Sequence, residues 1–360
     1  MRSVTSTGRA MLAGLATTLL AVACGSTSSP PATVDIGSGA LTGAGATFPA
    51  PFYSKAFFDY TAKYTQVTVN YQAVGSGAGI QQFIKNTVDF GASDVPMGSA
   101  DITSAGGSDT LTQIPTTLGV ISIAYNLSGV DKLQLDANTL SGIFLGHIKK
   151  WNDPALTALN SGVNLPNSAI TVVHRSDGSG TTFHFTDYLS KVSSEWKSSV
   201  GNAKSVKWPT GVGASGNQAV AQAITSTAGA IGYVELAYVV QTNMHQAYLK
   251  NADGNFVQAS VAGATAAAAT NTSVSPSNFS ITNASGANSY PIAGFSWVIL
   301  KTSYSDAAKG KAIVYLFKWL VTDGQTDGAS LDYAPLPSAV QQLALSNLKL
   351  VKAGGSAVLS

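Results

Sequence analysis

Arg175 is the only arginine after residue 9, and it opens a loop that is rich in glycine and in hydroxyl side chains. A guanidinium presents a flat fork of donors that fits two oxygens of a carboxylate or a phosphate. Asp177 follows closely as a nearby carboxylate. Ser179, Gly180 and Thr181 then supply hydroxyls and a glycine beside which backbone N–H groups can approach a ligand. These residue types suit a binding site for an oxyanion, although a solvated arginine beside an ordinary loop has the same pattern.

Three further segments share this design, in which an expected strand ends in a short loop of small polar residues. They are Gly45-Ala46-Thr47-Phe48, Gly75-Ser76-Gly77 and Ser93-Asp94. The first turn of a helix has unpaired N–H groups and a partial positive charge, so it binds anions without a net basic surface. In open α/β sheets such loops gather at the carboxyl ends of the strands, where ligands bind. Serine and threonine are also ordinary helix caps, so each loop alone is compatible with capping.

The charge of the chain argues against a nucleic-acid partner. Residues 1–23 contain two arginines and no acidic residue, and without them 18 basic residues face 18 acidic ones. A protein that binds nucleic acid has a strongly basic footprint, which this chain lacks. With 45% hydrophobic and 11% charged residues, the composition is that of a folded globular protein.

Residues 1–23 have the pattern of a secretory signal peptide. Two arginines precede an apolar stretch that is shorter than the roughly 20 residues of a membrane-spanning helix. Cys24, the only cysteine, follows at the position where bacterial lipoproteins carry their lipid. We therefore expect lipidation at Cys24 and a flexible tether over residues 24–39. An ordinary cleaved signal beside an incidental thiol is the alternative.

Short runs of β-branched residues alternate with helical stretches, which predicts an α/β fold. Because roughly 320 folded residues exceed a comfortable single core, we expect two lobes. Strands are expected over residues 67–71, 88–94, 120–125, 170–173, 230–234 and 295–300. Helices are expected over residues 52–64, 80–84, 140–144, 185–196, 216–226, 311–321 and 339–345. The strands over 120–125 and 295–300 are candidates to cross between the lobes, and residues 262–290 have no clear order.

Three motifs, in this order along the chain, carry a resemblance to a known family. They are Leu41-Thr-Gly-Ala-Gly-Ala-Thr-Phe-Pro-Ala-Pro51, Val88-Asp-Phe-Gly-Ala-Ser-Asp94 and Arg175-Ser-Asp-Gly-Ser-Gly-Thr181. From about Leu41 to Pro337 the chain resembles the phosphate-binding proteins of bacterial ABC phosphate importers. The resemblance implies a two-lobed, class II-like periplasmic-binding fold, in which each lobe is a mixed sheet flanked by helices and a two-strand hinge joins the lobes. Lobe I would comprise residues 40–122 and 293–360, and lobe II residues 123–292.

On this resemblance, Thr47, the amide of Phe48 and Ser76 would donate to phosphate, and Asp94 would be the single carboxylate acceptor. The chain has Gly77-Ala78 where the family frequently has serine and glycine, which leaves Ser76 itself unchanged. Phosphate keeps at least one proton near neutral pH, whereas sulfate keeps none. Asp94 can therefore accept a hydrogen bond from phosphate but only repel sulfate, and such matching can reject an analogue by roughly 10⁴-fold. A capping role for Asp94 is the alternative.

The resemblance further implies that Arg175 is the bidentate cation and that Asp177 holds it in place. Ser179, Gly180 and Thr181 would be donors at the start of a helix. Breaking a buried charged pair costs about 3–5 kcal/mol, so we expect the loss of Arg175 to weaken binding strongly. Asp177 can serve at the same time as an ordinary turn residue.

Catalysis has little support in the sequence, and we expect no enzyme. No G-x-S-x-G motif surrounds Ser76 or Ser179, and on one helix Ser179 and His184 would point about 140° apart. The histidines show no metal-ligand spacing, so neither a metal nor another cofactor is expected. Gly211-Val-Gly-Ala-Ser-Gly216 matches a dinucleotide-binding pattern, but it follows Trp208-Pro209 instead of a strand. A phosphatase, a surface adhesin and a binder of sulfate or molybdate are the alternatives.

The sequence thus predicts an exported protein that binds inorganic phosphate with high affinity outside the cytoplasmic membrane. It would deliver phosphate to the permease subunits of an ABC transporter, which work with a cytoplasmic ATPase. We expect a monomer that is held at the outer face of the cell membrane through Cys24 and that closes around its ligand.

Overall fold

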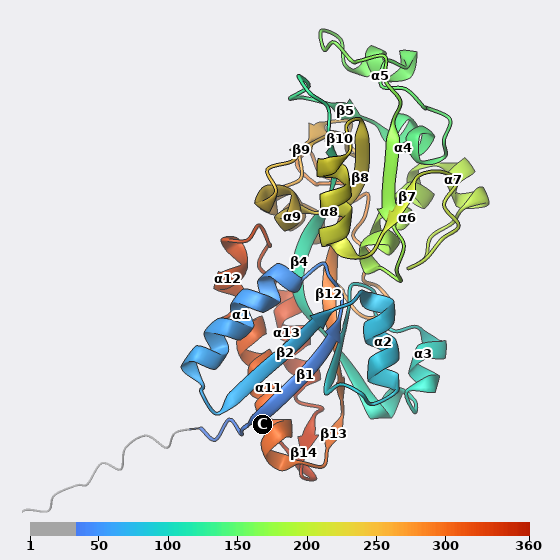
Figure 1. Ribbon diagram of the computed structural model, residues 1–360. Helices are drawn as coiled ribbons and strands as arrows, with labels where there is room; N and C mark the ends of the chain where they lie inside the picture. The colour runs from blue at the N-terminus through green and yellow to red at the C-terminus, as the bar shows by residue number, and fades with distance from the viewer. Residues whose placement is uncertain (1–33) are drawn as a thin grey trace, which may run out of the picture. The chain divides into compact units, whose positions relative to one another are not determined.

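The computed structural model describes residues 34–360. The predicted signal peptide, the predicted lipidation site Cys24 and most of the predicted tether lie outside the described residues. Within residues 34–360, no helix is both long enough and apolar enough to cross a membrane. Residues 36–360 form one unit of alternating strands and helices, which confirms the predicted mixed α/β fold (Figure 1).

A nine-stranded mixed sheet runs through this unit. In spatial order its strands are β2 (Val67–Ala73), β1 (Gly39–Gly45), β3 (Phe90–Ser93), β12 (Ala293–Lys301), β4 (Leu111–Tyr125), β8 (Ala230–Glu235), β6 (Thr171–Arg175) and β7 (Val212–Ala214), with β9 (His245–Gln246) paired to β4. β1 is parallel to β2 and β3, and β6 is parallel to β7 and β8. β12 is antiparallel to β3 and β4, and β4 is antiparallel to β8. Every strand expected from the sequence is present.

Strand β4 joins two parts of this sheet. Its residues 111–120 pair with β12, whereas residues 121–125 pair with β8. The sequence predicted only the end of this strand, because Pro115 cannot donate to a ladder and polar residues surround it. The ladder accommodates the proline region with a shift of register opposite β12. We call the part with β1, β2, β3 and β12 the first half, and the part with β6, β7 and β8 the second half.

The pairing directions bring the carboxyl ends of five strands to the boundary between the halves. β1 and β3 run opposite to β12 and end at the boundary from the first half. β6, β7 and β8 run opposite to β4 and end there from the second half. The predicted polar loops that follow these strands therefore gather in one place, as ligand-binding loops do in α/β proteins. A hinge motion of β4 and β12, between lobes with the bounds given above, stays a prediction.

Helices cover both faces of the sheet (Figure 1). Those that follow strands of the first half are α1 (Ala50–Lys63), α2 (Ser76–Ile84), α3 (Ser99–Ser104), α11 (Ala307–Val321), α12 (Gln325–Ala329) and α13 (Ser338–Leu348). The others are α4 (Ala137–Phe144), α5 (Pro154–Leu159), α6 (Gly180–Val192), α7 (Ser194–Ser199), α8 (Gly216–Ser226), α9 (Leu236–Gln241) and α10 (Val261–Ala268). The remaining elements are a 3-10 helix η1 (Ser108–Thr110) and short strands β5 (Gln134–Leu135), β10 (Tyr248–Lys250), β11 (Phe256–Val257), β13 (Ser303–Tyr304), β14 (Lys352–Ala353) and β15 (Ser356–Ala357).

Helices pack closely on both faces of the first half. On one face the rings of Phe57, Phe90 and Phe317 meet edge to face and join α1, β3 and α11. On the other face α2 packs directly on β1, since a Cβ at Gly79 would lie only 2.4 Å from the Cα of Gly45. This close approach places the start of α2 at the carboxyl end of β1.

One buried side chain organises part of the region for which the sequence predicted no order. The Asn251 amide group donates to the carbonyls of Gly286, Ala287 and Ser289 at 3.0–3.2 Å. Its Oδ1 accepts from the backbone amide of Asn255 at 2.9 Å. Such long-range bonds from one asparagine leave no periodic trace in the sequence, which explains why the region could not be interpreted.

We predict that Asn251→Ala lowers the free energy of unfolding by about 2 kcal/mol, because buried carbonyls lose their donor. Chemical denaturation measures this loss, and hydrogen exchange should accelerate at residues 286–289. Asn255→Ala is the matched control, since Asn255 is exposed and bonds to Asn251 only through its backbone. Equal stability of Asn251→Ala and the wild type would contradict this account.

Candidate anion-binding site

Four helix N-termini meet at the boundary between the halves. α1 follows the loop with Thr47 and α2 begins at Ser76, whereas α6 begins at Gly180 and α8 at Gly216. Across the boundary, the Gly180 amide donates to Ser76 Oγ at 3.1 Å. The Asn217 amide, in the first turn of α8, donates to Thr47 Oγ1 at 3.1 Å. Because N–H groups in a first turn have no intrahelical acceptor, four such turns concentrate donors and positive potential here.

The Arg175 guanidinium lies at this boundary, and the residue is only 3% exposed. Its Nε donates to Asp177 Oδ1 at 2.6 Å, and its Nη2 donates to the other oxygen of the same carboxylate. Burial opposes ionisation of Asp177, but the bonds from Arg175 and from the Gly216 amide hold the pKa of Asp177 below its usual value. The pair is therefore ionised. Since a guanidinium has five N–H donors, the pair leaves donors free for a further ligand.

Asp94 follows β3 and is only 1% exposed. Ser296 Oγ donates to Asp94 Oδ1, and Ser76 Oγ lies 3.4 Å from Oδ2. Burial raises the pKa of Asp94 to about 7, although the Ser296 hydroxyl, nearby Arg175 and the Ser76 hydroxyl oppose the rise. Near neutral pH this carboxyl group is thus present both protonated and ionised, so it can donate or accept a hydrogen bond.

Two glycines allow the halves to approach each other around these carboxylates. A Cβ at Gly180 would lie 2.4 Å from the Asp94 Cβ, which belongs to the other half. Conversely, Gly75 of the first half faces Asp177 of the second half. Gly75 has φ +95°, and a Cβ there would lie 2.3 Å from Asp177 Oδ2. The Asp94 carboxylate can be buried and the Asp177 carboxylate half-buried at the boundary only because the facing backbone carries no side chain.

All nine residues that the sequence predicted for the site lie at this boundary. They are Thr47, Phe48, Ser76, Asp94, Arg175, Asp177, Ser179, Gly180 and Thr181. Ser179 caps α6, since its Oγ accepts from the Thr182 amide at 3.1 Å. The hydroxyl proton is not used in that bond and can be donated elsewhere. That these residues bind a ligand stays a prediction.

Asn217 is a fully buried residue of the boundary that was not predicted from the sequence. Its Nδ2 donates to Thr47 Oγ1 at 2.9 Å and to Thr181 Oγ1 at 3.1 Å, so it links the two halves. A signal was present, because β7 leads through Ser215-Gly216 into α8, as a strand leads into a helix in the other loops. β7 lies within the glycine motif of residues 211–216, so no strand precedes the motif itself, as predicted, although a short strand precedes α8.

Ser296 and His184 are further buried polar residues that were not predicted for the site. His184 Nε2 lies 2.9 Å from the backbone oxygen of Asp94. Burial lowers the pKa of His184 to about 4, so the ring is neutral and Nε2–H donates to that oxygen. No local pattern marks either residue, because both reach Asp94 from a distant part of the chain. Among residues 34–360, no group of three or more His, Cys, Asp or Glu side chains is placed to hold a metal ion.

Comparison with known proteins relates the chain to one family. The model of the PBP superfamily domain matches residues 27–315. The phosphate-binding protein PstS of Xylella fastidiosa (strain 9a5c) is 45% identical over 318 residues, which cover 87% of this chain and 86% of the relative. PstS of Pasteurella multocida (strain Pm70) is 46% identical over 306 residues, which cover 84% and 88%. The structure of a high-affinity periplasmic phosphate-binding protein (PfluDING) bound with phosphate has the same fold, with a TM-score of 0.67 at 23% identity over 86% of this chain and 93% of the other.

We predict that Asp94→Asn removes a pH-dependent loss of stability from the ligand-free protein. Because the folded protein keeps the Asp94 proton up to about pH 7 while the unfolded chain releases it near 3.8, the stability of the wild type falls as pH rises between these values. Across this window, the free energy of unfolding of the variant should rise relative to that of the wild type by up to about 4 kcal/mol. Above pH 7 the difference between the two should stay constant. Denaturation at a series of pH values measures the difference, with exposed Asp253→Asn as control. A constant difference from pH 4 to pH 7 would contradict the assignment.

Proposed function

This chain belongs to the PstS family of phosphate-binding proteins, and we propose on that premise that it binds inorganic phosphate at the boundary between the halves. The observation that carries the proposal is the pair of buried Arg175 and half-buried Asp177, which lies close to Asp94 among four helix N-termini. A guanidinium that one carboxylate holds in place can grip a second anion with its remaining donors. The protein would pass its phosphate to the permease subunits of an ABC transporter and their cytoplasmic ATPase.

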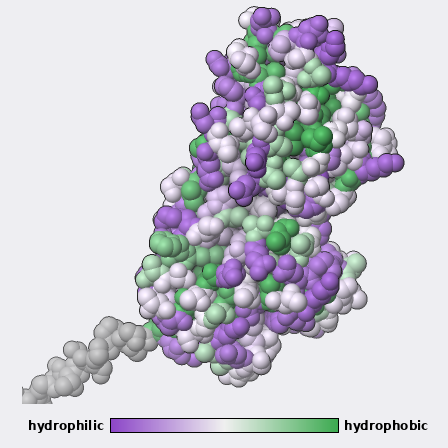
Figure 2. Space-filling model, viewed as in Figure 1, coloured by the Kyte–Doolittle hydropathy of each residue, from purple (hydrophilic) through white to green (hydrophobic). Residues whose placement is uncertain are grey.

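The arrangement explains how a chain without excess positive charge can bind an anion. One arginine provides the formal charge, and the N-termini of α1, α2, α6 and α8 add the partial positive charge of four helix ends. On the face shown in Figure 2, hydrophilic residues are spread over both halves instead of gathering in one patch. Attraction for phosphate would thus come from oriented groups in the interior.

Asp94 would give the site its preference for phosphate over other oxyanions. Phosphate near neutral pH carries at least one proton and can donate it to the Asp94 carboxylate. Sulfate carries none, so it meets either an ionised carboxylate, which repels it, or a site that must first take up a proton. Since the pKa of Asp94 is raised to about 7, a larger fraction of Asp94 is protonated as the pH falls, and sulfate then meets less repulsion.

Donors from both halves would make phosphate a bridge between them. Thr47, the Phe48 amide and Ser76 would donate from the first half, and Arg175 with the start of α6 (residues 179–181) from the second. A ligand that contacts both halves binds the closed arrangement more tightly than an open one, so it shifts the population toward closure. β4 and β12, the strands that continue through the boundary, would act as the hinge between the predicted lobes.

We propose a binding role without catalysis. The relatives are binding proteins by name. The most plausible nucleophile and base, Ser179 and His184, have other uses, since Ser179 caps α6 and His184 donates to the backbone oxygen of Asp94. Incubation with a chromogenic phosphate ester tests this directly, and sustained release of phosphate would favour an enzyme.

We predict that Asp94→Asn lowers the preference for phosphate over sulfate at least about 10-fold, because an asparagine amide can donate to sulfate and a carboxylate cannot. The affinity for phosphate should change less. Calorimetric titration with phosphate, with sulfate as competitor, measures both affinities. In the wild type, sulfate should compete better as the pH falls below about 7, since Asp94 then gains a proton, and the variant should lose this pH dependence.

Asp131→Asn serves as control for this experiment, because Asp131 is an exposed carboxylate in the loop before β5. Unchanged selectivity in Asp94→Asn would remove Asp94 from the proposed mechanism. A wild-type protein that takes up no phosphate in the titration would refute the proposed function itself.

The position of Cys24 supports a lipid anchor that holds a monomer at the outer face of the cell membrane. We predict that Cys24→Ser releases the protein from the membrane fraction into the soluble exported fraction, while its affinity for phosphate stays that of the wild type. Fractionation after metabolic labelling with a palmitate analogue provides the measurement. Membrane retention of the serine variant would show that another segment anchors the chain.

A further inference from the structure

Three tyrosine hydroxyls donate to three successive carbonyl groups of the loop between β1 and α1. The bonds run from Tyr71 to Ala46 O at 2.7 Å, from Tyr238 to Thr47 O at 2.7 Å and from Tyr333 to Phe48 O at 2.6 Å. Burial raises the pKa of all three hydroxyls well above the usual value for tyrosine, so each remains a neutral donor. Each of these three successive carbonyl oxygens therefore accepts a hydrogen bond from a tyrosine hydroxyl.

The bond to Thr47 O bears directly on the proposed ligand contacts. The Thr47 carbonyl and the Phe48 N–H belong to the same peptide group, and in a trans peptide they point in opposite directions. A donor that fixes the carbonyl therefore fixes the direction of the N–H. It also polarises the peptide group, which strengthens the N–H as a donor.

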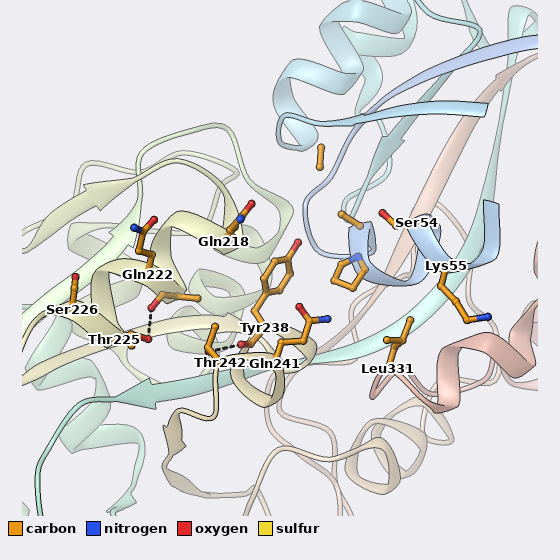
Figure 3. Close-up of a pocket in the computed structure, with 14 residues that line it drawn as sticks. Ser54, Lys55, Gln218, Gln222, Thr225, Ser226, Tyr238, Gln241, Thr242 and Leu331 are labelled. Carbon is orange, nitrogen blue, oxygen red and sulfur yellow. Dashed lines mark hydrogen bonds between the residues drawn. The ribbon is translucent and has the colours of Figure 1, made fainter. Parts of the chain in front are cut away.

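Tyr238 differs from Tyr71 in where it comes from. Tyr71 lies on β2, in the same half as the loop, whereas Tyr238 lies on α9, which follows β8 of the second half. A groove of about 1060 Å³ separates the start of α1 from α8 and α9 on this side of the boundary. In Figure 3, Tyr238 projects across this groove from α9, and its hydroxyl points toward the chain that leads into α1. The bond to Thr47 O consequently depends on the halves being close together.

The start of α9 is itself held at the boundary, which gives Tyr238 a fixed base. Glu235 caps the helix, since its Oε2 accepts from the Ala237 amide at 3.0 Å. The Glu235 amide donates to Asn217 Oδ1 at 3.1 Å, so the cap is tied to the first turn of α8. Tyr238 and Asn217 thus approach Thr47 from neighbouring helices, one at its carbonyl and the other at its hydroxyl.

We propose that Tyr238 is a positioning residue for the phosphate site. By bonding the Thr47 carbonyl only when the halves are closed, it aims the Phe48 N–H at the ligand and stabilises the closed arrangement. The inference rests on the proposed function, because it takes the Phe48 N–H as a phosphate donor.

Tyr238→Phe tests the inference, since it removes the hydroxyl and leaves the ring. We expect phosphate to bind about 10-fold more weakly, because one buried hydrogen bond is lost, and to dissociate faster while its association rate is unchanged. Calorimetry and stopped-flow mixing with inorganic phosphate measure these quantities. At saturating phosphate, the Phe48 amide proton should also resonate at lower frequency in the variant, as expected for a less polarised peptide group.

Tyr71→Phe is the matched variant, because it removes the donor of the adjacent carbonyl from within one half. It should lower the unfolding temperature with and without phosphate, whereas Tyr238→Phe should lower mainly that of the phosphate-bound protein. Equal losses with and without phosphate in Tyr238→Phe, together with wild-type dissociation kinetics, would reveal a merely structural role and overturn the inference. If the wild type binds phosphate and Tyr238→Phe binds it as tightly, the inference alone fails. If the wild type binds none, the proposed function fails with it.

Discussion

The burial of ionisable groups between the two halves is the constraint on which the rest of the structure depends. Moving a charge into a protein interior costs several kcal/mol unless partners compensate it. The two-bond contact of Arg175 with Asp177 and the Gly216 amide supply that compensation on one side. The glycines that face Asp94 and Asp177 are required for the same reason, because a side chain there would prevent the halves from closing over these groups. Sheet direction, helix placement and glycine positions all serve to bring these groups together.

Much of this arrangement could be predicted, because it is encoded locally. Each predicted loop is a strand end, a few small polar residues and in most cases a helix start, and the chain direction alone places such loops at one edge of a sheet. Asp94 and Arg175 were recognisable because each stands at the end of its own strand. The alternation of strands and helices and the strands that continue through the boundary could be predicted for the same reason. The first part of β4 could not, because it contains a proline.

The rest could not be predicted, because it depends on contacts between distant segments. Ser296 donates to Asp94 only because β12 pairs with β3 in one particular register, which no pattern around either residue indicates. His184 reaches the Asp94 backbone from a helix of the other half. Asn251 organises a loop more than thirty residues away with bonds that leave no periodicity. Asn217 is an intermediate case, since the sequence shows a loop of small residues before an expected helix there but does not show the short strand β7.

Burial favours the protonated form of the remaining acids at the boundary, which have no additional cation beside them within residues 34–360. Asp94 and Glu235 are both buried, neither forms an ion pair among the described residues, and burial raises the pKa of each. The Tyr333 hydroxyl donates to Phe48 O and also lies 3.0 Å from Glu235 Oε2, and since it has a single proton, a protonated Glu235 satisfies both contacts. A second arginine or lysine would have neutralised these acids at the expense of selectivity, because it would attract every anion alike. With a single guanidinium, tyrosine hydroxyls, backbone amides and an Asp94 carboxyl group that is partly ionised near neutral pH, the boundary can distinguish anions by the protons they carry.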